Sequence, residues 1–167
     1  EKDQCTINEC TLKHSTQYID RVNNEFVKIG MRGTSIIVSS GDSGAPGNSD
    51  KLSENCNIKN PINPMFPASS PWVTSIGATF VVNMPNISWN YITPLCIEHK
   101  CATGMDEIGA TFKYTDWTPG GGFSEYSSEI TPNWQKKFVD KYLLSENILP
   151  SNFRKNGRSY PDISVVG

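Results

Sequence analysis

The sequence predicts an α/β fold in which a mainly parallel sheet is flanked by helices. A helical pattern of apolar residues at 18–29 leads through a glycine turn into a short β-branched segment, residues 34–39. This segment and a second one, residues 72–79, carry no charge, which is typical of strands buried on both faces of a parallel sheet. At 167 residues the chain has the size of one domain and can bury a core.

The first helix is predicted from its apolar side chains. These recur at helical spacing: Tyr18, Ile19, Val22, Phe26 and Ile29. Ser15 or Thr16 can cap the start of the helix, and Gly30 or Gly33 can end it. The segment thus predicts a helix followed by a tight turn and a strand.

The middle of the chain alternates loops with the second strand. Residues 44–64 are rich in Gly, Asn, Ser and Pro and predict an exposed loop. Residues 66–71, Phe-Pro-Ala-Ser-Ser-Pro, lead into the second strand, and their prolines fix the backbone angle φ. Residues 83–110 predict irregular structure, and residues 118–124, Thr-Pro-Gly-Gly-Gly-Phe-Ser, predict a tight turn.

A second helix is predicted with Thr131 as its N-cap and Pro132 at its first position. Its apolar residues share one face and are expected to join the core: Trp134, Phe138, Val139 and Tyr142. Residues 158–167 open another strand. Within it, Asp162 is predicted to cap or pair structurally rather than to catalyse.

Composition excludes some classes of partner. Fifteen basic and seventeen acidic residues leave a net charge of −2 without a basic run, so nucleic acid is not an expected partner. No apolar stretch reaches the ~20 residues of a membrane span. The chain begins with Glu1 and ends at Gly167 directly after an apolar run, and we expect it to be a piece of a longer precursor.

Five cysteines and one sequon favour the secretory pathway. Two cysteine pairs lie five residues apart, each able to close a local disulfide, and one cysteine is left over to pair outside these residues: Cys5 with Cys10, Cys96 with Cys101, and Cys56. The spacing does not match a zinc ribbon, and His14 and His99 stand alone, so no metal site is expected. Asn86 begins a glycosylation sequon.

The most informative motif is Gly-Asp-Ser-Gly-Ala-Pro at residues 41–46. It places an acid, a hydroxyl and backbone N–H groups at a strand's C-terminal end, where open α/β sheets carry their ligand chemistry. One residue separates it from the Gly-Asp-Ser-Gly-Gly-Pro around the nucleophile of chymotrypsin-like peptidases. For Ser43 to have that role, its surroundings should be antiparallel and a triad histidine should precede it, but only His14 does. The other alternative is a plain turn.

Five segments, in order and at matching spacing, resemble the sedolisins, which are serine-carboxyl peptidases. They are residues 18–47, 66–79, 120–126, 132–135 and 157–167. The five segments span nearly all of the chain from Tyr18 onward, whereas residues 1–17 and 80–115 show no such resemblance. It implies a subtilisin-like three-layer fold with a mainly parallel central sheet, and it makes residues 1–167 an internal fragment of one catalytic domain.

The resemblance also implies a role for Asp42. In sedolisins an aspartic acid replaces the asparagine that donates to the reaction's oxyanion in subtilisins, and Asp42 is the matching residue. A carboxylate cannot donate a hydrogen bond, so Asp42 must be protonated to work. Activity is then confined to acidic surroundings, such as a lysosome, an acidic vacuole or an acidic extracellular space. Ser43 has no nucleophilic role, and Ser39, Ser40 and Gly41 are candidate substrate contacts.

By the same resemblance, other catalytic parts are expected outside these residues. The Glu/Asp pair, four residues apart, would precede Glu1, and the serine nucleophile and the Ca²⁺ ligands would follow Gly167. We interpret the Gly-Thr-Ser at residues 33–35 as coincidence, because it precedes the strand. The fragment alone is therefore expected to be inactive, with the rest of the domain as its partner and with no metal ligand of its own.

The implied reaction is hydrolysis of peptide bonds in peptide or protein substrates through an acyl-enzyme, with tripeptides released from N-termini as by the tripeptidyl-peptidases of the family. The alternative is a secreted, non-catalytic relative that binds peptides or a partner.

Overall fold

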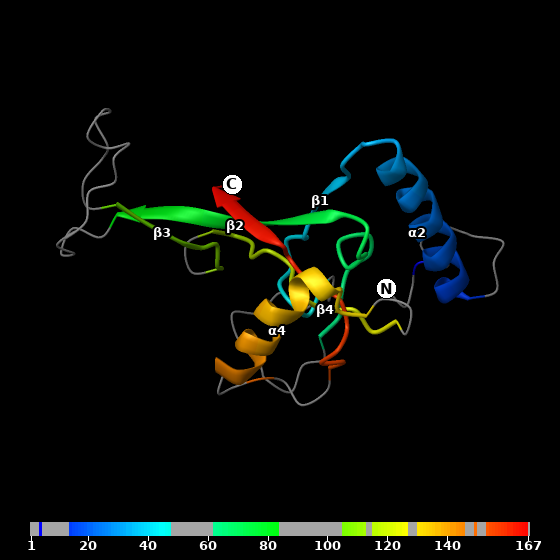
Figure 1. The fold of residues 1–167 in the computed structure, drawn as a ribbon. Coiled ribbons are helices and arrows are strands. Elements are labelled where there is room, and N and C mark those ends of the chain that lie inside the picture. Colours follow the sequence, from blue (N-terminus) through cyan, green and yellow to red (C-terminus); the bar gives the residue numbers. More distant parts are fainter. Residues whose placement is uncertain are drawn as a thin grey trace.

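The computed structural model describes residues 4, 14–47, 62–83, 105–112, 115–126, 130–145, 149 and 153–166. Strand β2 (Thr74–Asn83) lies at the centre and pairs with three other strands (Figure 1). Strands β1 (Ile37–Ser39) and β6 (Ile163–Val166) run parallel to it, and β3 (Met105–Gly109) runs antiparallel. The chain is thus a mixed α/β fold with a small mixed sheet.

The pairing of β2 decides where its partners lie. Ile76 pairs with both β1 and β6, so these two strands flank β2 on opposite sides. Thr79 pairs with both β3 and β6, so β3 also lies opposite β6. Strands β1 and β3 therefore follow one another along the same side of β2.

Strand β3 lies within the stretch 83–110, where irregular structure was expected, and it makes the sheet less parallel than predicted. Its sequence carries charge: Glu107 is exposed, and its Oε1 accepts a hydrogen bond from Thr79 Oγ1 at 2.5 Å. An antiparallel strand needs to bury only one face, so it does not require an uncharged run.

Helix α2 (Ser15–Met31) confirms the first predicted helix. Its N-cap is His14, which makes no side-chain capping bond, rather than either of the two hydroxyl residues that follow. At the other end, Gly33 has a φ of 79° and donates its N–H to Gly30 O at 2.9 Å, as expected for a glycine that ends a helix.

The buried side of α2 packs on the turn that precedes β2. The ring of Phe66 lies 6.4 Å from that of Tyr18 and 6.2 Å from that of Phe26, between centroids. Ser70 Oγ donates to Oδ1 of the buried Asn23 at 2.6 Å. These contacts attach the helix to the start of the central strand.

Helix α4 (Asn133–Ser145) begins one residue later than predicted. The Pro132 carbonyl accepts the N–H of Lys136 at 3.0 Å, so Pro132 precedes the helix. Thr131 Oγ1 donates to Gly157 O at 2.7 Å, a contact outside the helix.

The apolar stripe of α4 is mostly exposed, which corrects the expectation that it joins the core. Val139 is buried, but Trp134, Phe138 and Tyr142 are 58%, 70% and 47% exposed. Apolar spacing shows which residues share a helix face, but it does not show what covers that face.

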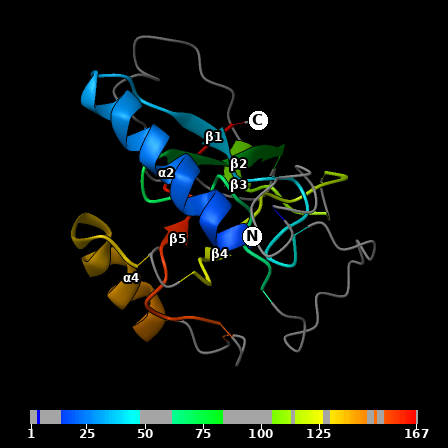
Figure 2. The same ribbon diagram turned by 90° about the vertical axis from the view of Figure 1, so that its right-hand side faces the viewer.

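A second sheet connects the glycine-rich turn with the end of the chain. Strand β4 (Gly122–Phe123) pairs antiparallel with β5 (Ser159–Tyr160). Figures 1 and 2 place these strands and α4 together on one side of the central sheet. The predicted turn at 118–124 thus ends in a strand.

Two predictions of exposure are also corrected. Strand β1 was expected to be buried, but Ile37 is 70% exposed, and within the described residues β1 has β2 alone as its neighbouring strand. The loop 44–64 was expected to be exposed, but its described ends are joined, because Asn63 N–H donates to Ala45 O at 2.9 Å. Gly47 and Ile62 are accordingly buried.

Candidate active site

The Asp42 turn, residues 41–44, follows the end of β1. At this point along β2, β3 replaces β1 as the neighbouring strand. Ser40 N–H donates to Ile76 O at 2.8 Å, and Gly41 then turns the chain with a φ of 98°. Asp42 follows as an exposed residue, and Gly44 closes the turn with a φ of 65°. An acid therefore stands at the C-terminal end of a parallel strand, as the motif predicted.

A second stretch of chain, residues 118–120, holds this turn through its main chain. Thr118 N–H donates to Asp42 O at 3.1 Å, and Gly44 N–H donates to Thr118 O at 3.0 Å. Gly120 N–H donates to Gly41 O at 2.8 Å. We call residues 118–120 the support segment. Among the described residues, no hydrogen bond or ion pair to the Asp42 carboxyl group is formed.

The residues predicted to contact substrate differ in exposure. Ser39 is exposed and Gly41 is half-buried, with Met65 beside it. Ser40 is only 2% exposed, and its hydroxyl has no hydrogen-bond partner within the described part of the chain. Its side chain therefore lies in the interior, while its neighbours on both sides reach the surface.

The geometry around Ser43 does not suit a chymotrypsin-like nucleophile. Strand β1, which leads to it, is parallel to β2, and Ser43 itself forms a parallel bridge with Thr118. His14 is exposed at the start of α2. The surroundings that such a peptidase needs are antiparallel.

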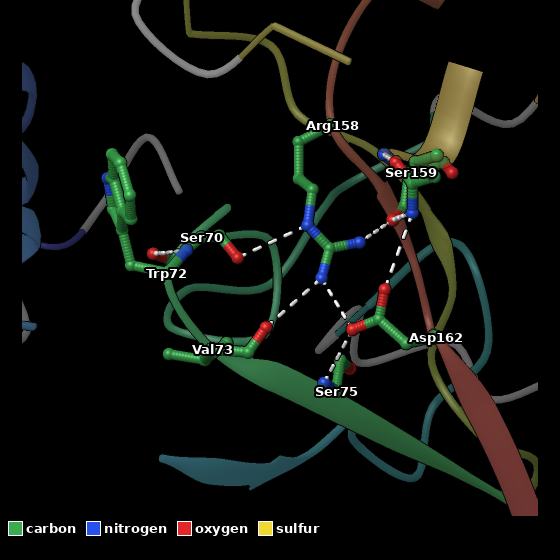
Figure 3. Close-up of polar contacts among 8 residues, drawn as sticks. Ser70, Trp72, Val73, Ser75, Arg158, Ser159 and Asp162 are labelled. Atoms are coloured by element: carbon green, nitrogen blue, oxygen red, sulfur yellow. Dashed lines mark hydrogen bonds and ion pairs between the residues drawn. The ribbon is translucent and has the colours of Figure 1, made fainter. Parts of the chain in front are cut away.

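Near the start of β2, a buried ion pair joins the segments that surround this strand (Figure 3). Arg158 is fully buried, and its Nη2 lies 2.6 Å from Asp162 Oδ2. Its Nε donates to Ser70 O at 3.2 Å, and its Nη1 donates to Ser159 O. Asp162 Oδ2 also accepts the N–H of Ser75 at 2.8 Å. The structural role predicted for Asp162 is confirmed.

Gln135 of α4 completes this cluster. Its Nε2 donates to Ser159 O at 2.6 Å and to Asp162 Oδ1 at 3.4 Å, and its Oε1 accepts the N–H of Ser159 at 3.1 Å. The Arg158 guanidinium also lies 5.5 Å from the ring centre of Trp134. Sequence reasoning did not single out Arg158 or Gln135. The one available signal was a charged residue at the start of the predicted strand, residues 158–167.

An apolar groove of about 720 Å³ lies beside the support segment, between the glycine-rich turn and α4. Its walls include Ile62, Gly121, Phe123, Phe138, Tyr142 and Phe153. The exposed stripe of α4 forms one side of it.

Some predicted features lie outside the described residues: the five cysteines, Asn86 and His99. Within the residues that the structure describes, no three His, Cys, Asp or Glu side chains come together as a metal site. The described helices include none with the length and apolar character needed to cross a membrane.

Comparisons with known proteins indicate the family of the chain. No family model matches it. It is 39% identical over 173 residues to physarolisin of Physarum polycephalum, covering 100% of this chain and 29% of that protein. It is 33% identical over 154 residues to tripeptidyl-peptidase 1 of Canis lupus familiaris and 34% identical to that of Homo sapiens, covering 91% of this chain and 22% of each.

Among solved structures, the chain matches Pseudomonas sedolisin, a serine-carboxyl proteinase, complexed with two molecules of pseudo-iodotyrostatin. The TM-score is 0.49 and the sequence identity is 22%. The match covers 86% of this chain and 31% of the sedolisin chain. The chain spans less than a third of the length of these relatives. The similarity to physarolisin and the tripeptidyl-peptidases extends over all or nearly all of the chain, and on this ground the chain belongs to the sedolisin family.

Proposed function

We propose that the protein containing these residues is a serine-carboxyl peptidase active at acidic pH, in which Asp42 donates a hydrogen bond to the oxyanion. The position of Asp42 carries the proposal. It is exposed, it follows a parallel strand, and its turn is bonded to a second segment of chain. A donor held in advance at the place where charge develops is the main requirement for stabilising an oxyanion.

The chemistry requires Asp42 in its neutral form. Attack on a peptide carbonyl turns the carbonyl oxygen into an oxyanion, to which a protonated carboxyl group can donate its O–H. A carboxylate would instead repel that oxygen. The attacking serine and the acid pair that activates it are expected outside the 167 residues, so the fragment alone is expected to be inactive. Ser39 and Gly41, which reach the surface, are proposed to border the bound substrate, with the buried Ser40 between them.

The finer activity that we propose is removal of tripeptides from the N-termini of peptides or proteins. Identity of 33–34% to tripeptidyl-peptidase 1 from several mammals supports it. For the whole protein we propose an acidic location reached through the secretory pathway, glycosylation at Asn86, disulfides, and bound Ca²⁺ with ligands outside this chain. The rest of the catalytic domain would be its direct partner.

The flanking sequence separates this proposal from a non-catalytic relative that binds peptides or a partner. A peptidase requires a Glu/Asp pair four residues apart before residue 1 and a Gly-Thr-Ser after residue 167. Absence of either element in the complete coding sequence would exclude the peptidase.

Replacement of the donor tests the role of Asp42 directly. In the full-length protein, Asp42→Ala should lower kcat for a peptide substrate at acidic pH by about 10²–10³-fold, the usual cost of one oxyanion donor. Asp140→Ala is the matched control, because Asp140 is an exposed aspartate on α4, paired with the exposed Lys136. Equal rates for the two variants would refute the proposal.

The substitution Asp42→Asn gives a pH test with a fixed sign. An amide donates at every pH, whereas the carboxyl group donates only while it is protonated. The ratio of wild-type kcat to Asp42→Asn kcat should therefore fall as the pH rises. A ratio that stays constant between pH 3 and pH 6 would contradict donation by a neutral acid.

A further inference from the structure

We propose that the support segment, residues 118–120, positions Asp42 for donation, with Gly120 and Thr118 as its positioning residues. This inference rests on the proposed function of Asp42. It goes beyond that function because it assigns the positioning of the Asp42 carboxyl group to a stretch of chain more than 70 residues away in the sequence.

The main-chain bonds bracket the acid. The support segment bonds to Gly41 O, to Asp42 O and to Gly44 N, which lie before, at and after the acid. With its backbone held on both sides, Asp42 can move its carboxyl group by side-chain rotation alone. The bonds leave that carboxyl group unused, so they orient the donor without competing for it.

Gly120 permits this close approach because it has no side chain. A Cβ atom at this position would lie 2.0 Å from Ser40 O and 2.9 Å from the Ser40 carbonyl carbon. Both are main-chain atoms of β1's continuation, which cannot swing aside as a flexible side chain would. A side chain at residue 120 must therefore displace the support segment or the Ser40 main chain, and it disturbs the bond from Gly120 N to Gly41 O.

Thr118 anchors the support segment independently of the turn. Its Oγ1 donates to Ala110 O at 2.8 Å, and Ala110 N–H donates to Ala78 O of β2 at 3.1 Å. Its Cγ2 would lie 3.0 Å from a Cβ atom on Gly44. The turn is thus fixed to β2 directly and also through Thr118.

Two substitutions, each with a matched control, test the inference in the full-length enzyme. Gly120→Ala should lower kcat by about 10²-fold with a much smaller change in KM, since displacement by about 1 Å costs this much. Gly121→Ala is its control, because a Cβ atom there meets no atom closer than 3.3 Å. Thr118→Val should give a smaller loss of kcat. Its control is Thr131→Val, which removes a hydroxyl bond to the main-chain carbonyl of Gly157, away from the Asp42 turn.

The background Asp42→Ala distinguishes positioning from general structural support. If the support segment acts through Asp42, Gly120→Ala and Thr118→Val should lower kcat in the wild type and have little further effect in Asp42→Ala. A thermal unfolding transition checks each variant, and Thr118→Val carries the test if Gly120→Ala does not fold.

Equal fold-losses in both backgrounds would overturn the inference while leaving the role of Asp42 intact. Folded Gly120→Ala and Thr118→Val variants with the kcat of their controls would do the same. A kcat unchanged by Asp42→Ala itself would refute the proposed function, and the inference with it.

Discussion

Arg158 shows how a single residue can hold several segments together. A buried cation loses its hydration, which costs several kcal/mol unless a counter-charge and hydrogen-bond acceptors replace the water. Here the counter-charge is Asp162, and main-chain carbonyls of Ser70, Val73 and Ser159 are the acceptors. The same contacts connect the turn before β2 with the chain that enters β6.

Breaking this pair should be costly. We expect Arg158→Met to lower the free energy of unfolding of the full-length protein by about 3–5 kcal/mol, because it leaves Asp162 largely buried without its counter-charge. Lys136→Met breaks the exposed pair with Asp140 and should stay within about 0.5 kcal/mol of the wild type. Urea unfolding followed by fluorescence measures both, and similar losses would show that the buried pair contributes little.

Sequence reasoning found one partner of this pair and not the other. Asp162 stood beside a proline at the start of a predicted strand, which suggested a structural role, and the structure confirms it. Arg158 was not recognised, because two of its acceptors, Ser70 O and Val73 O, lie 88 and 85 residues earlier in the chain. Nothing local in the sequence indicates main-chain carbonyls at that distance.

At the scale of elements, the attachment of α2 depends on a polar contact as well as on aromatic rings. Asn23→Ala would leave the buried hydroxyl of Ser70 without its acceptor, and we expect a loss of about 1–3 kcal/mol in the free energy of unfolding. The neighbouring Asn24 is exposed, so Asn24→Ala should have little effect. Thermal unfolding of both variants checks this, and equal shifts in Tm would argue against the contact.

The elements were predictable to different degrees, for physical reasons. Helix α2 and strand β2 follow from local periodicity and from an uncharged run, so their positions could be predicted. The Asp42 turn could also be placed, since it follows a strand directly. The support segment could not, because its bonds to the turn are made by main-chain atoms, which every sequence has. Burial of the α4 stripe depends on neighbours that its spacing does not specify.

At the scale of the whole molecule, β6 is a strand whose apolar side chains are exposed. Its residues Ile163, Val165 and Val166 are exposed in this structure although they are β-branched and apolar. Side chains two residues apart on a strand share one face of the sheet, so Ile163 and Val165 lie together, and an exposed apolar face of this kind usually meets another part of a protein. Since the chain covers less than a third of its relatives, we expect the rest of the domain to cover β6.

A charge placed on β6 tests this expectation. In the full-length protein, Val165→Asp should lower the free energy of unfolding by about 2 kcal/mol or more, because it would bury an unpaired carboxylate. Met31→Asp is the control, since Met31 is 83% exposed at the end of α2. Equal Tm values for the two variants would mean that β6 stays open to solvent in the complete protein.

The arrangement of β1 and β3 along one side of β2 has a consequence for how the protein should lose activity on heating. The bonds Ser40 N–Ile76 O and Ala110 N–Ala78 O tie the acid and its support to neighbouring positions of one strand. If β2 shifted along its axis, the Asp42 turn and the support segment would move by the same amount. The distance between them would stay unchanged. Moderate heating should therefore not erode turnover gradually. Activity should persist until β2 separates from its neighbours and then disappear together with the fold.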